Sequence, residues 1–378
     1  MSTLQQFSID NSTAEIVDYS VSNWQTRTSA ADNFWQGIAW NGTVFAAVSF
    51  SGVGNRVMTS PDGITWTIRT SAADNPWFAI AWNGTVFAAV SYDGVGNRVM
   101  TSPDGITWTS RTSAADTGWQ AIAWNGTVFA AVSDSGTGNR VMTSPDGITW
   151  TIRTSAADNA WAAIAWNGTV FAATARSGTG NRVMTSPDGI TWTARTSAAD
   201  NQWTGIAWNG TVFAAVALDG AGNRVMTSPD GITWTARTAA VASSWFAIAW
   251  NGTVFAAVAG SGTGNRVMTS PDGITWTSRT SAADNAWRGI AWNGTVFAAI
   301  AASGTGNRVM TSPDGITWTI RTSAEDNGWT AIAWNGLGTA PMYLLPAAGT
   351  GTVFAAVAQD GTANRVMTCH FSKFGSPS

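Results

Sequence analysis

Short apolar runs separated by turn residues fill most of the chain. In the first complete unit the runs are residues 38–40, 43–49, 56–60 and 64–70. Asn41-Gly42 follows the first run, a glycine-rich segment (51–55) follows the second, and Pro61-Asp-Gly63 follows the third. Runs of Val, Phe, Ile, Thr and Trp bounded by such turns predict short antiparallel strands, and Asn-Gly favours a two-residue hairpin. We therefore predict four strands per unit, called A to D in chain order, and no helix.

The whole unit recurs along the chain. Its most uniform stretch, Thr59-Ser-Pro-Asp-Gly-Ile-Thr-Trp-Thr67, begins again at a spacing of 42 residues, at Thr101, Thr143, Thr185, Thr227, Thr269 and Thr311. A unit of this length cannot bury its own apolar surface, and four antiparallel strands per repeat are typical of a propeller blade. Strand A occurs eight times, which predicts an all-β, eight-bladed β-propeller.

The repeat begins and ends in the middle of a unit. It enters at Trp24, which matches Trp66 of strand D, and it leaves at Thr368, just before the next strand D is due. We predict that the N-terminal strand completes the last blade, because this closes the ring and leaves no unpaired strand edge. An open solenoid is the alternative, although it needs no such offset. The predicted segments are a non-repeat segment 1–23, the propeller 24–369 with an apolar insertion 337–351 in its last A–B turn, and a tail 370–378.

Composition narrows the classes of partner. Hydrophobic residues make up 44% of the chain and charged residues 11%, with a net charge of −3. Nucleic-acid binding needs a clustered basic face, so no nucleic-acid partner is expected. The single cysteine, Cys369, leaves no intrachain disulfide to form. We recognise no secretory signal in residues 1–23 and no apolar run that would span a bilayer. The expectation is a soluble monomer, cytoplasmic or part of a particle.

The differences between the nearly identical units carry the functional information. Three positions vary most: the residue before the tryptophan that precedes strand A, the residue after it, and the residue at the end of strand B. Antiparallel order places the D–A and B–C loops on one face and the two fixed turns on the other. Variation confined to one loop face of a rigid scaffold is typical of a recognition surface. Neutral drift of exposed loops after duplication is the alternative.

We expect a composite ligand-binding patch on this face, centred on Phe50, Gln36, Phe78 and Tyr92. Its partner would be a glycan or a cell-surface protein. The candidate ligand-binding residues are Phe34, Gln36, Phe50, Phe78, Tyr92, Gln120, Asp134, Arg176, Gln202, Thr204, Leu218, Phe246, Arg288, Thr330 and Gln359.

The tryptophan between the first two variable positions is a second candidate. Eight such indoles near the mouth of the ring are a possible stacking surface for sugars, and the alternative is that each one wedges two blades apart. These residues are Trp35, Trp77, Trp119, Trp161, Trp203, Trp245, Trp287 and Trp329.

No other pattern predicts chemistry. No metal-ligand spacing, phosphate loop or catalytic triad is present, so no metal, cofactor or catalytic residue is expected. The repeated Asp62 and Asp74 types are too sparse for calcium, and we expect each to bond the amides of its own loop. Cys369 and His370 are adjacent in a strand and would point to opposite faces. The seven Asn-Gly-Thr sequons are explained by the turn requirement for Asn-Gly.

The segment Ser60-Pro-Asp-Gly-Ile-Thr-Trp66 resembles the Asp-box, Ser-x-Asp-x-Gly-x-Thr-Trp, of sialidase-type (BNR) propellers, with one residue fewer between Asp62 and Gly63. The resemblance covers residues 24–368 as an array. It implies that the box shapes the turn between the third and fourth strands. Propeller arrays with this kind of box also resemble those found in some lectins and in phage-tail and bacterial surface-recognition proteins.

The family's enzymes use an arginine cluster, a tyrosine with a glutamate, and an acidic aspartate. Here tyrosine occurs only at 19, 92 and 343, and glutamate only at 15 and 325. We therefore expect non-catalytic recognition. Two alternatives stay open: a symmetric scaffold, natural or engineered, without a ligand, and a glycosidase. A glycosidase would need a carboxylate pair on the variable face, drawn from Asp134, Asp93, Asp219 and Asp360.

Overall fold

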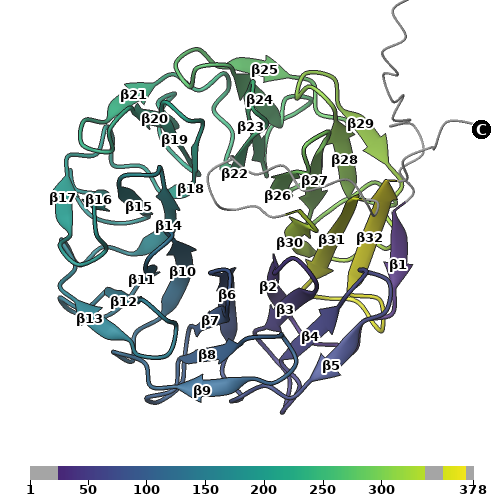
Figure 1. The fold of residues 1–378 in the computed structure, drawn as a ribbon. Coiled ribbons are helices and arrows are strands. Elements are labelled where there is room, and N and C mark those ends of the chain that lie inside the picture. Colours follow the sequence, from purple (N-terminus) through teal and green to yellow (C-terminus); the bar gives the residue numbers. More distant parts are fainter. Residues whose placement is uncertain (1–23, 337–351, 372–378) are drawn as a thin grey trace, which may run out of the picture.

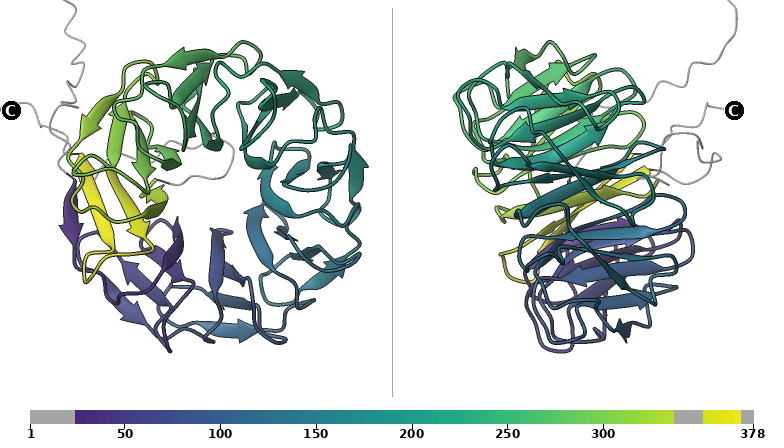
Figure 2. Two further views of the ribbon diagram at one scale, coloured as in Figure 1. Left: turned by 180° about the vertical axis from the view of Figure 1, so that it is seen from behind. Right: turned by 90° about the vertical axis from the view of Figure 1, so that its left-hand side faces the viewer.

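The computed structural model describes residues 24–336 and 352–371, all of them in strands, turns and loops. Eight four-stranded antiparallel sheets stand around a ring (Figure 1). Figure 2 shows the ring from its other face and edge-on. This confirms the predicted all-β, eight-bladed propeller. The predicted segment 1–23, the insertion 337–351 and residues 372–378 of the predicted tail 370–378 lie outside the described residues, whereas residues 370 and 371 of that tail belong to the last strand of the propeller. In the described part, no helix is long and apolar enough to cross a membrane.

Each blade has the same strand order, with strand A innermost and strand D outermost. The first blade consists of β2 (Trp35–Trp40), β3 (Phe45–Ser49), β4 (Val57–Ser60) and β5 (Thr67–Arg69). The next three contain β6 (Trp77–Trp82), β7 (Phe87–Ser91), β8 (Val99–Ser102), β9 (Thr109–Arg111), β10 (Trp119–Trp124), β11 (Phe129–Ser133), β12 (Val141–Ser144), β13 (Thr151–Arg153), β14 (Trp161–Trp166), β15 (Phe171–Ala175), β16 (Val183–Ser186) and β17 (Thr193–Arg195).

The remaining blades repeat this arrangement. They contain β18 (Trp203–Trp208), β19 (Phe213–Ala217), β20 (Val225–Ser228), β21 (Thr235–Arg237), β22 (Trp245–Trp250), β23 (Phe255–Ala259), β24 (Val267–Ser270), β25 (Thr277–Arg279), β26 (Trp287–Trp292), β27 (Phe297–Ala301), β28 (Val309–Ser312), β29 (Thr319–Arg321), β30 (Trp329–Trp334), β31 (Thr352–Ala358), β32 (Val366–Phe371) and β1 (Gln25–Arg27).

The ring closes with strands from both ends of the chain. β1 pairs antiparallel with β32, with Gln25 opposite Thr368, and completes the sheet β1-β32-β31-β30. The purple β1 lies beside the yellow β32 in Figure 1 and in the left view of Figure 2. Trp24 is buried and stacks on Phe354, with ring centroids 6.1 Å apart. The predicted closure is confirmed, and the open solenoid is excluded.

A β-bulge at the start of each inner strand lengthens it beyond the prediction. Trp35 pairs with Ser49, Gly37 pairs with Val48, and the register shifts between them at Gln36. The same shift recurs in the other blades. Strand A therefore begins at Trp35, three residues before the predicted Ile38. A bulge adds a residue and re-aims a side chain, and here it sets the direction of the second variable position.

The core lies between neighbouring blades. β3 is fully buried, as its apolar character on both faces predicts. Phe45, Trp35 and Trp66 of the first blade pack against Val353 and Val357 of the last one, and every blade boundary repeats this cluster. Sheets stacked in this way bury both faces of each blade, which makes the ring a rigid support for its loops.

The fixed turn between strands C and D is held by its own polar groups. Asp62 Oδ1 accepts hydrogen bonds from the backbone N–H of Ile64 (2.7 Å) and Thr65 (3.1 Å) and from Ser60 Oγ. Gly63, at φ +75°, donates its N–H to Ser60 Oγ. Burial raises the pKa of the Asp62 carboxyl, but these hydrogen bonds outweigh it and the pKa is lowered. The prediction that Asp62 bonds its own turn amides is confirmed, and no metal-binding cluster occurs in the described part of the chain.

Candidate functional site

Six of the eight D–A loops are pinned by side chains to the blade before them and to the blade after them. Asp74 Oδ1 accepts a hydrogen bond from Gly54 N (2.5 Å) and lies 3.8 Å from Arg56 Nε, both in the preceding blade's B–C loop. The next residue, Asn75, donates Nδ2–H to Asn97 O in the following blade. The prediction that Asp74 bonds amides of its own D–A loop is therefore wrong, because the amide that it binds belongs to the B–C loop of the preceding blade. The two pins fix the variable loops to the rigid sheets.

A backbone hydrogen bond brings the first and third variable positions together in every blade. In the first blade, Phe50 N donates to Phe34 O at 2.8 Å, and the other blades repeat it. The second position, Gln36 and its equivalents, is the bulge residue of the inner strand. All three variable positions thus occupy the same end of each blade, opposite the two fixed turns. Differences between units are concentrated on this loop face.

Variable side chains contact one another across the second and third blades. The rings of Phe78 and Tyr92 lie 6.5 Å apart. The Tyr92 ring also lies over Gly118 of the next blade, where a Cβ would come within 2.9 Å of Tyr92 Cε2. In that blade Gln120 Nε2 donates to Asp134 Oδ2 at 2.7 Å. We call these residues, with Arg176 of the fourth blade, the aromatic–acidic patch: Phe78, Tyr92, Gln120, Asp134 and Arg176.

Asp134 is the electrostatic centre of this patch. Burial raises the pKa of its carboxyl, although the hydrogen bond from Gln120 and the charges of Arg176 and Arg140 oppose the rise. Asp134 Oδ1 is buried without a hydrogen-bond partner among the described residues, so one oxygen of the carboxylate is poorly solvated.

The raised pKa makes Asp134 a source of pH-dependent stability. The protonated form is favoured in the folded state, so its contribution is full below the unfolded pKa of about 3.9 and is lost as the pH rises through the folded pKa. Asp134→Asn should therefore raise the thermal midpoint slightly at pH 7, on the order of 1–2 °C. The gain should vanish near pH 4 in matched thermal melts. A lower midpoint at pH 7 would show that attraction to the two arginines outweighs burial.

A second contact between variable residues joins the sixth and seventh blades. The Arg288 guanidinium carbon lies 4.0 Å from the centre of the Phe246 ring. Phe246 in turn lies over Gly260, where a Cβ would meet Phe246 Cε2 at 2.6 Å. A guanidinium over an aromatic face is a favourable cation–π contact. We call Phe246 and Arg288 the cationic patch.

The other candidate residues divide into two kinds. Thr204 and Thr330 turn toward the neighbouring blade, where their hydroxyls donate to Trp245 O and Trp35 O. The second kind is open to solvent: Gln202 and Gln359 are exposed, Leu218 is half-buried, and Phe34 (47%) and Phe50 (37%) are exposed. The four residues predicted as the centre of the ligand-binding patch do not form one cluster. The rings of Phe78 and Tyr92 are in contact. In the described part of the chain, no ring contact or side-chain hydrogen bond joins Phe50 or Gln36 to them.

The predicted stacking ring of tryptophans is wrong. Their indoles are fully buried between blades, and Trp35 Nε1 donates to Ala31 O of the loop at 3.2 Å. A sugar cannot stack on a face that the next blade already covers, so the wedge alternative holds. The residues concerned are Trp35, Trp77, Trp119, Trp161, Trp203, Trp245, Trp287 and Trp329.

The carboxylates considered for a glycosidase bond within their own blades. Asp93 lies 3.3 Å from Arg98, Asp219 accepts from Gln202, and Asp360 accepts from Gly328 N. Asp134 is held by Gln120. These contacts do not pair one carboxylate with another.

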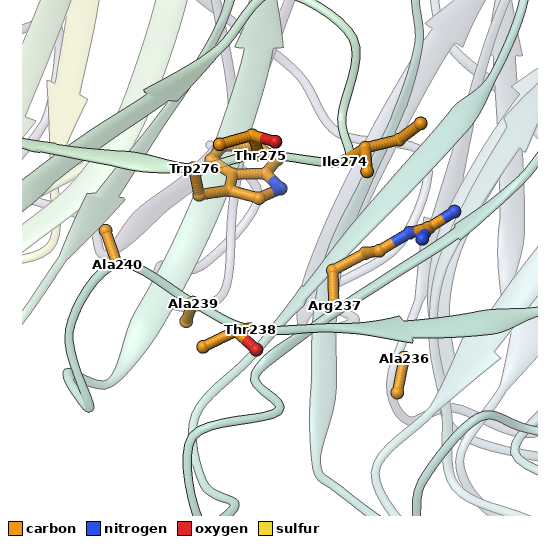
Figure 3. Close-up of a pocket in the computed structure, with 8 residues that line it drawn as sticks. All are labelled: Ala236, Arg237, Thr238, Ala239, Ala240, Ile274, Thr275 and Trp276. Atoms are coloured by element: carbon orange, nitrogen blue, oxygen red, sulfur yellow. The ribbon is translucent and has the colours of Figure 1, made fainter.

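A pocket of about 530 Å³ opens between the fifth and sixth blades. Figure 3 shows the end of β21 and the loop after it along one side, with Arg237, Thr238, Ala239 and Ala240, and Ile274 to Trp276 along the other. It offers two hydroxyls, a guanidinium and an indole. Sequence comparison did not single out this pocket, because most of its lining is identical from unit to unit.

Comparisons with known proteins identify the fold. No protein-family model and no curated protein matches the sequence. Among solved structures, the computationally designed Ika8 protein is similar with a TM-score of 0.65 and 12% identity, covering 91% of this chain and 99% of that one. Virginiamycin B lyase from Staphylococcus aureus is similar with a TM-score of 0.59 and 13% identity, covering 74% and 95%. YCF48 from Cyanidioschyzon merolae gives 0.53 and 15%, covering 92% and 98%. At these identities the likeness shows the β-propeller fold alone.

Proposed function

We propose that this protein is a non-catalytic recognition propeller that binds a glycan or a cell-surface protein through its variable loop face. The observation that carries the proposal is that large and small variable residues are complementary: a glycine lies where a neighbouring aromatic ring leaves no room for a side chain. Phe246 occurs in the same blade as Gly260, the one glycine at the third variable position. Tyr92 lies over Gly118 of the next blade, where a larger residue would collide with its ring.

Matched neighbours argue against neutral drift. Independent changes in eight exposed loops have no reason to place a glycine beneath an aromatic ring across a blade boundary. The contacts instead build two chemically different surfaces, the aromatic–acidic patch and the cationic patch. Rigid aromatic anchors beside charged groups are the composition of binding hot spots.

Binding should depend strongly on Tyr92, whose side chain is 41% exposed. We would apply the purified protein, displayed at several densities, to a broad glycan array and to intact cells. Tyr92→Ala should weaken binding roughly 30-fold, as for a hot-spot residue that contributes about 2 kcal/mol. Val95→Ala is the matched control, since Val95 is 88% exposed in the same B–C loop but lies outside the patch.

Two results would contradict the proposal. Equal binding by the Tyr92 and Val95 variants would remove the patch from the interaction. Turnover of a fluorogenic glycoside that is lost in Asp134→Asn would identify an enzyme instead.

A symmetric scaffold without a ligand is the second candidate. The near identity of the units and the similarity to a computationally designed propeller favour it. In that case the array and the cells would both stay blank, and changes in the two patches would alter stability alone.

A further inference from the structure

One D–A loop departs from the usual sequence at four positions, 239, 241, 242 and 243, besides its variable last residue. Residues 238–244 read Thr-Ala-Ala-Val-Ala-Ser-Ser, whereas residues 196–202 read Thr-Ser-Ala-Ala-Asp-Asn-Gln. Ala239 and Ala242 replace a serine and an aspartate found in the other seven loops, and Ser243 replaces the usual asparagine. The loop between the fifth and sixth blades therefore lacks both the aspartate that pins the other seven loops and the asparagine that pins six of them.

The aspartate has the same two partners wherever it occurs. Its Oδ1 accepts the N–H of the second loop glycine, or of Ala363 in the last blade, at 2.5–2.8 Å. The same oxygen lies 3.6–3.8 Å from Nε of the arginine two residues farther on. The paired aspartates are Asp32, Asp74, Asp116, Asp158, Asp200, Asp284 and Asp326. In seven blades, therefore, the glycine amide and the arginine together bind a carboxylate.

The fifth blade keeps both partners without the aspartate. Arg224 donates from Nε to Gly220 O and from Nη1 to Leu218 O, both at 2.8 Å, as its equivalents do. Its guanidinium is therefore held in the usual place. No carboxylate of the described chain lies within ion-pair distance of it, and Ala242 is exposed.

The backbone shows the effect of the missing hydrogen bond. Gly222 has φ +92°, whereas the equivalent glycines lie between +67° and +69°. In those loops the carboxylate fixes the amide, and in the fifth blade no carboxylate of the described residues does. The N–H of Gly222 and the cation of Arg224 remain side by side in half-buried residues, next to the exposed Ala242.

We propose that Gly222 and Arg224 form a binding site for a carboxylate of the ligand, in the place that an internal aspartate takes in the other blades. One amide and one guanidinium are complementary to a single carboxylate oxygen, as the internal pairs demonstrate. The site deepens the proposed function, on which it rests for the identity of the ligand: a glycan bound at this face would carry an acidic sugar.

The pocket in Figure 3 adjoins this site through Ala239. Its N–H donates to Gly222 O at 2.8 Å, and its side chain lines the pocket beside Thr238 and Trp276. Hydroxyls and an indole are groups that contact sugar rings. The sugar that carries the carboxylate would extend into this pocket.

The test follows glycine amides of the full chain, labelled with ¹⁵N-glycine, during titration with sodium glucuronate at constant ionic strength. Gly222→Ala identifies the Gly222 signal by its loss, since Ala363 already occupies the equivalent position. We expect a saturable shift of Gly222 with a dissociation constant on the order of 1–10 mM, because a half-exposed ion pair is weak. Ala242→Asp should abolish the shift by restoring the internal carboxylate.

Asp284→Ala is the matched gain-of-site variant. It should produce a second saturable shift, at Gly264, whose amide Asp284 otherwise occupies. N-acetylglutamate in place of glucuronate distinguishes the sources: an equal shift assigns carboxylates in general, and a smaller one assigns an acidic sugar. The proposal is overturned if chloride moves Gly222 as far as glucuronate does, or if Ala242→Asp shifts like the unaltered chain.

The two proposals fail separately. A Gly222 shift with a blank array would leave the carboxylate site standing and remove the glycan from the proposed function. If the array binds the protein, Ala242→Asp leaves that binding unchanged and Gly222 does not shift, the proposed function stands and the carboxylate site is removed.

Discussion

A chain without residues 1–28 should melt on the order of 10 °C lower than the complete chain and associate into oligomers. The truncation removes β1 and Trp24, whose indole is 5% exposed between the last blade and its neighbour. Loss of a buried tryptophan alone costs about 3–5 kcal/mol, which corresponds to several degrees in a domain of this size. The bared edge of β32 then offers unpaired backbone groups to another chain.

Two further chains sharpen this experiment. A chain that starts at Trp24 keeps β1 and should melt like the full protein. A synthetic peptide with residues 24–34 added to the truncated chain should restore the melting temperature, because it supplies the pairing of Gln25 with Thr368 and the Arg27 Nε bond to Thr368 Oγ1. Calorimetry and light scattering measure both. A truncated chain that stays monomeric with an unchanged melt would contradict closure by β1.

Trp161→Ala should destabilise the protein by about 3–5 kcal/mol. Trp161 is fully buried, and its Nε1 donates to Ala157 O at 3.1 Å. The change would leave a cavity between two blades and an unpaired carbonyl. Trp161 suits the test because its neighbours Ala160 and Ala162 belong to neither patch.

Chemical denaturation of Trp161→Ala and Phe34→Ala separates a wedge from a stacking group. Phe34 is 47% exposed, so its loss should change stability by less than about 0.5 kcal/mol. A Trp161 variant that unfolds like the unaltered chain but loses ligand binding would return the indoles to a stacking role.

The architecture could be predicted from the repeat because the features that indicate it are local in the sequence. Period, turn residues and the count of strand A are all read from neighbours in sequence, and the mid-unit start at Trp24 located the closure. The bulge at Gln36 escaped the prediction because it interrupts the alternation on which strand assignment depends.

The site was harder to predict because its contacts cross blade boundaries. Nothing next to Asp74 in sequence points to Gly54 or Arg56 as its partners. The burial of Trp35 depends on the preceding blade in the same way. The replacement by Ala242 is visible in the sequence, but its meaning appears only once the partners of the other aspartates are known.

The β1–β32 pairing also decides how the chain must fold. Gln25 meets Thr368 only after almost the whole ring has formed, so closure is the last and most entropically costly search. The strand D copies share with β1 its arginine and the tryptophan before it, as Trp66 and Arg69 match Trp24 and Arg27, although the two residues between them differ. Any of these copies competes for β32 and produces a ring with too few blades. Refolding should therefore be slow and divided among several trapped species, and synthesis from the N-terminus, which presents β1 first, gives the correct partner a head start.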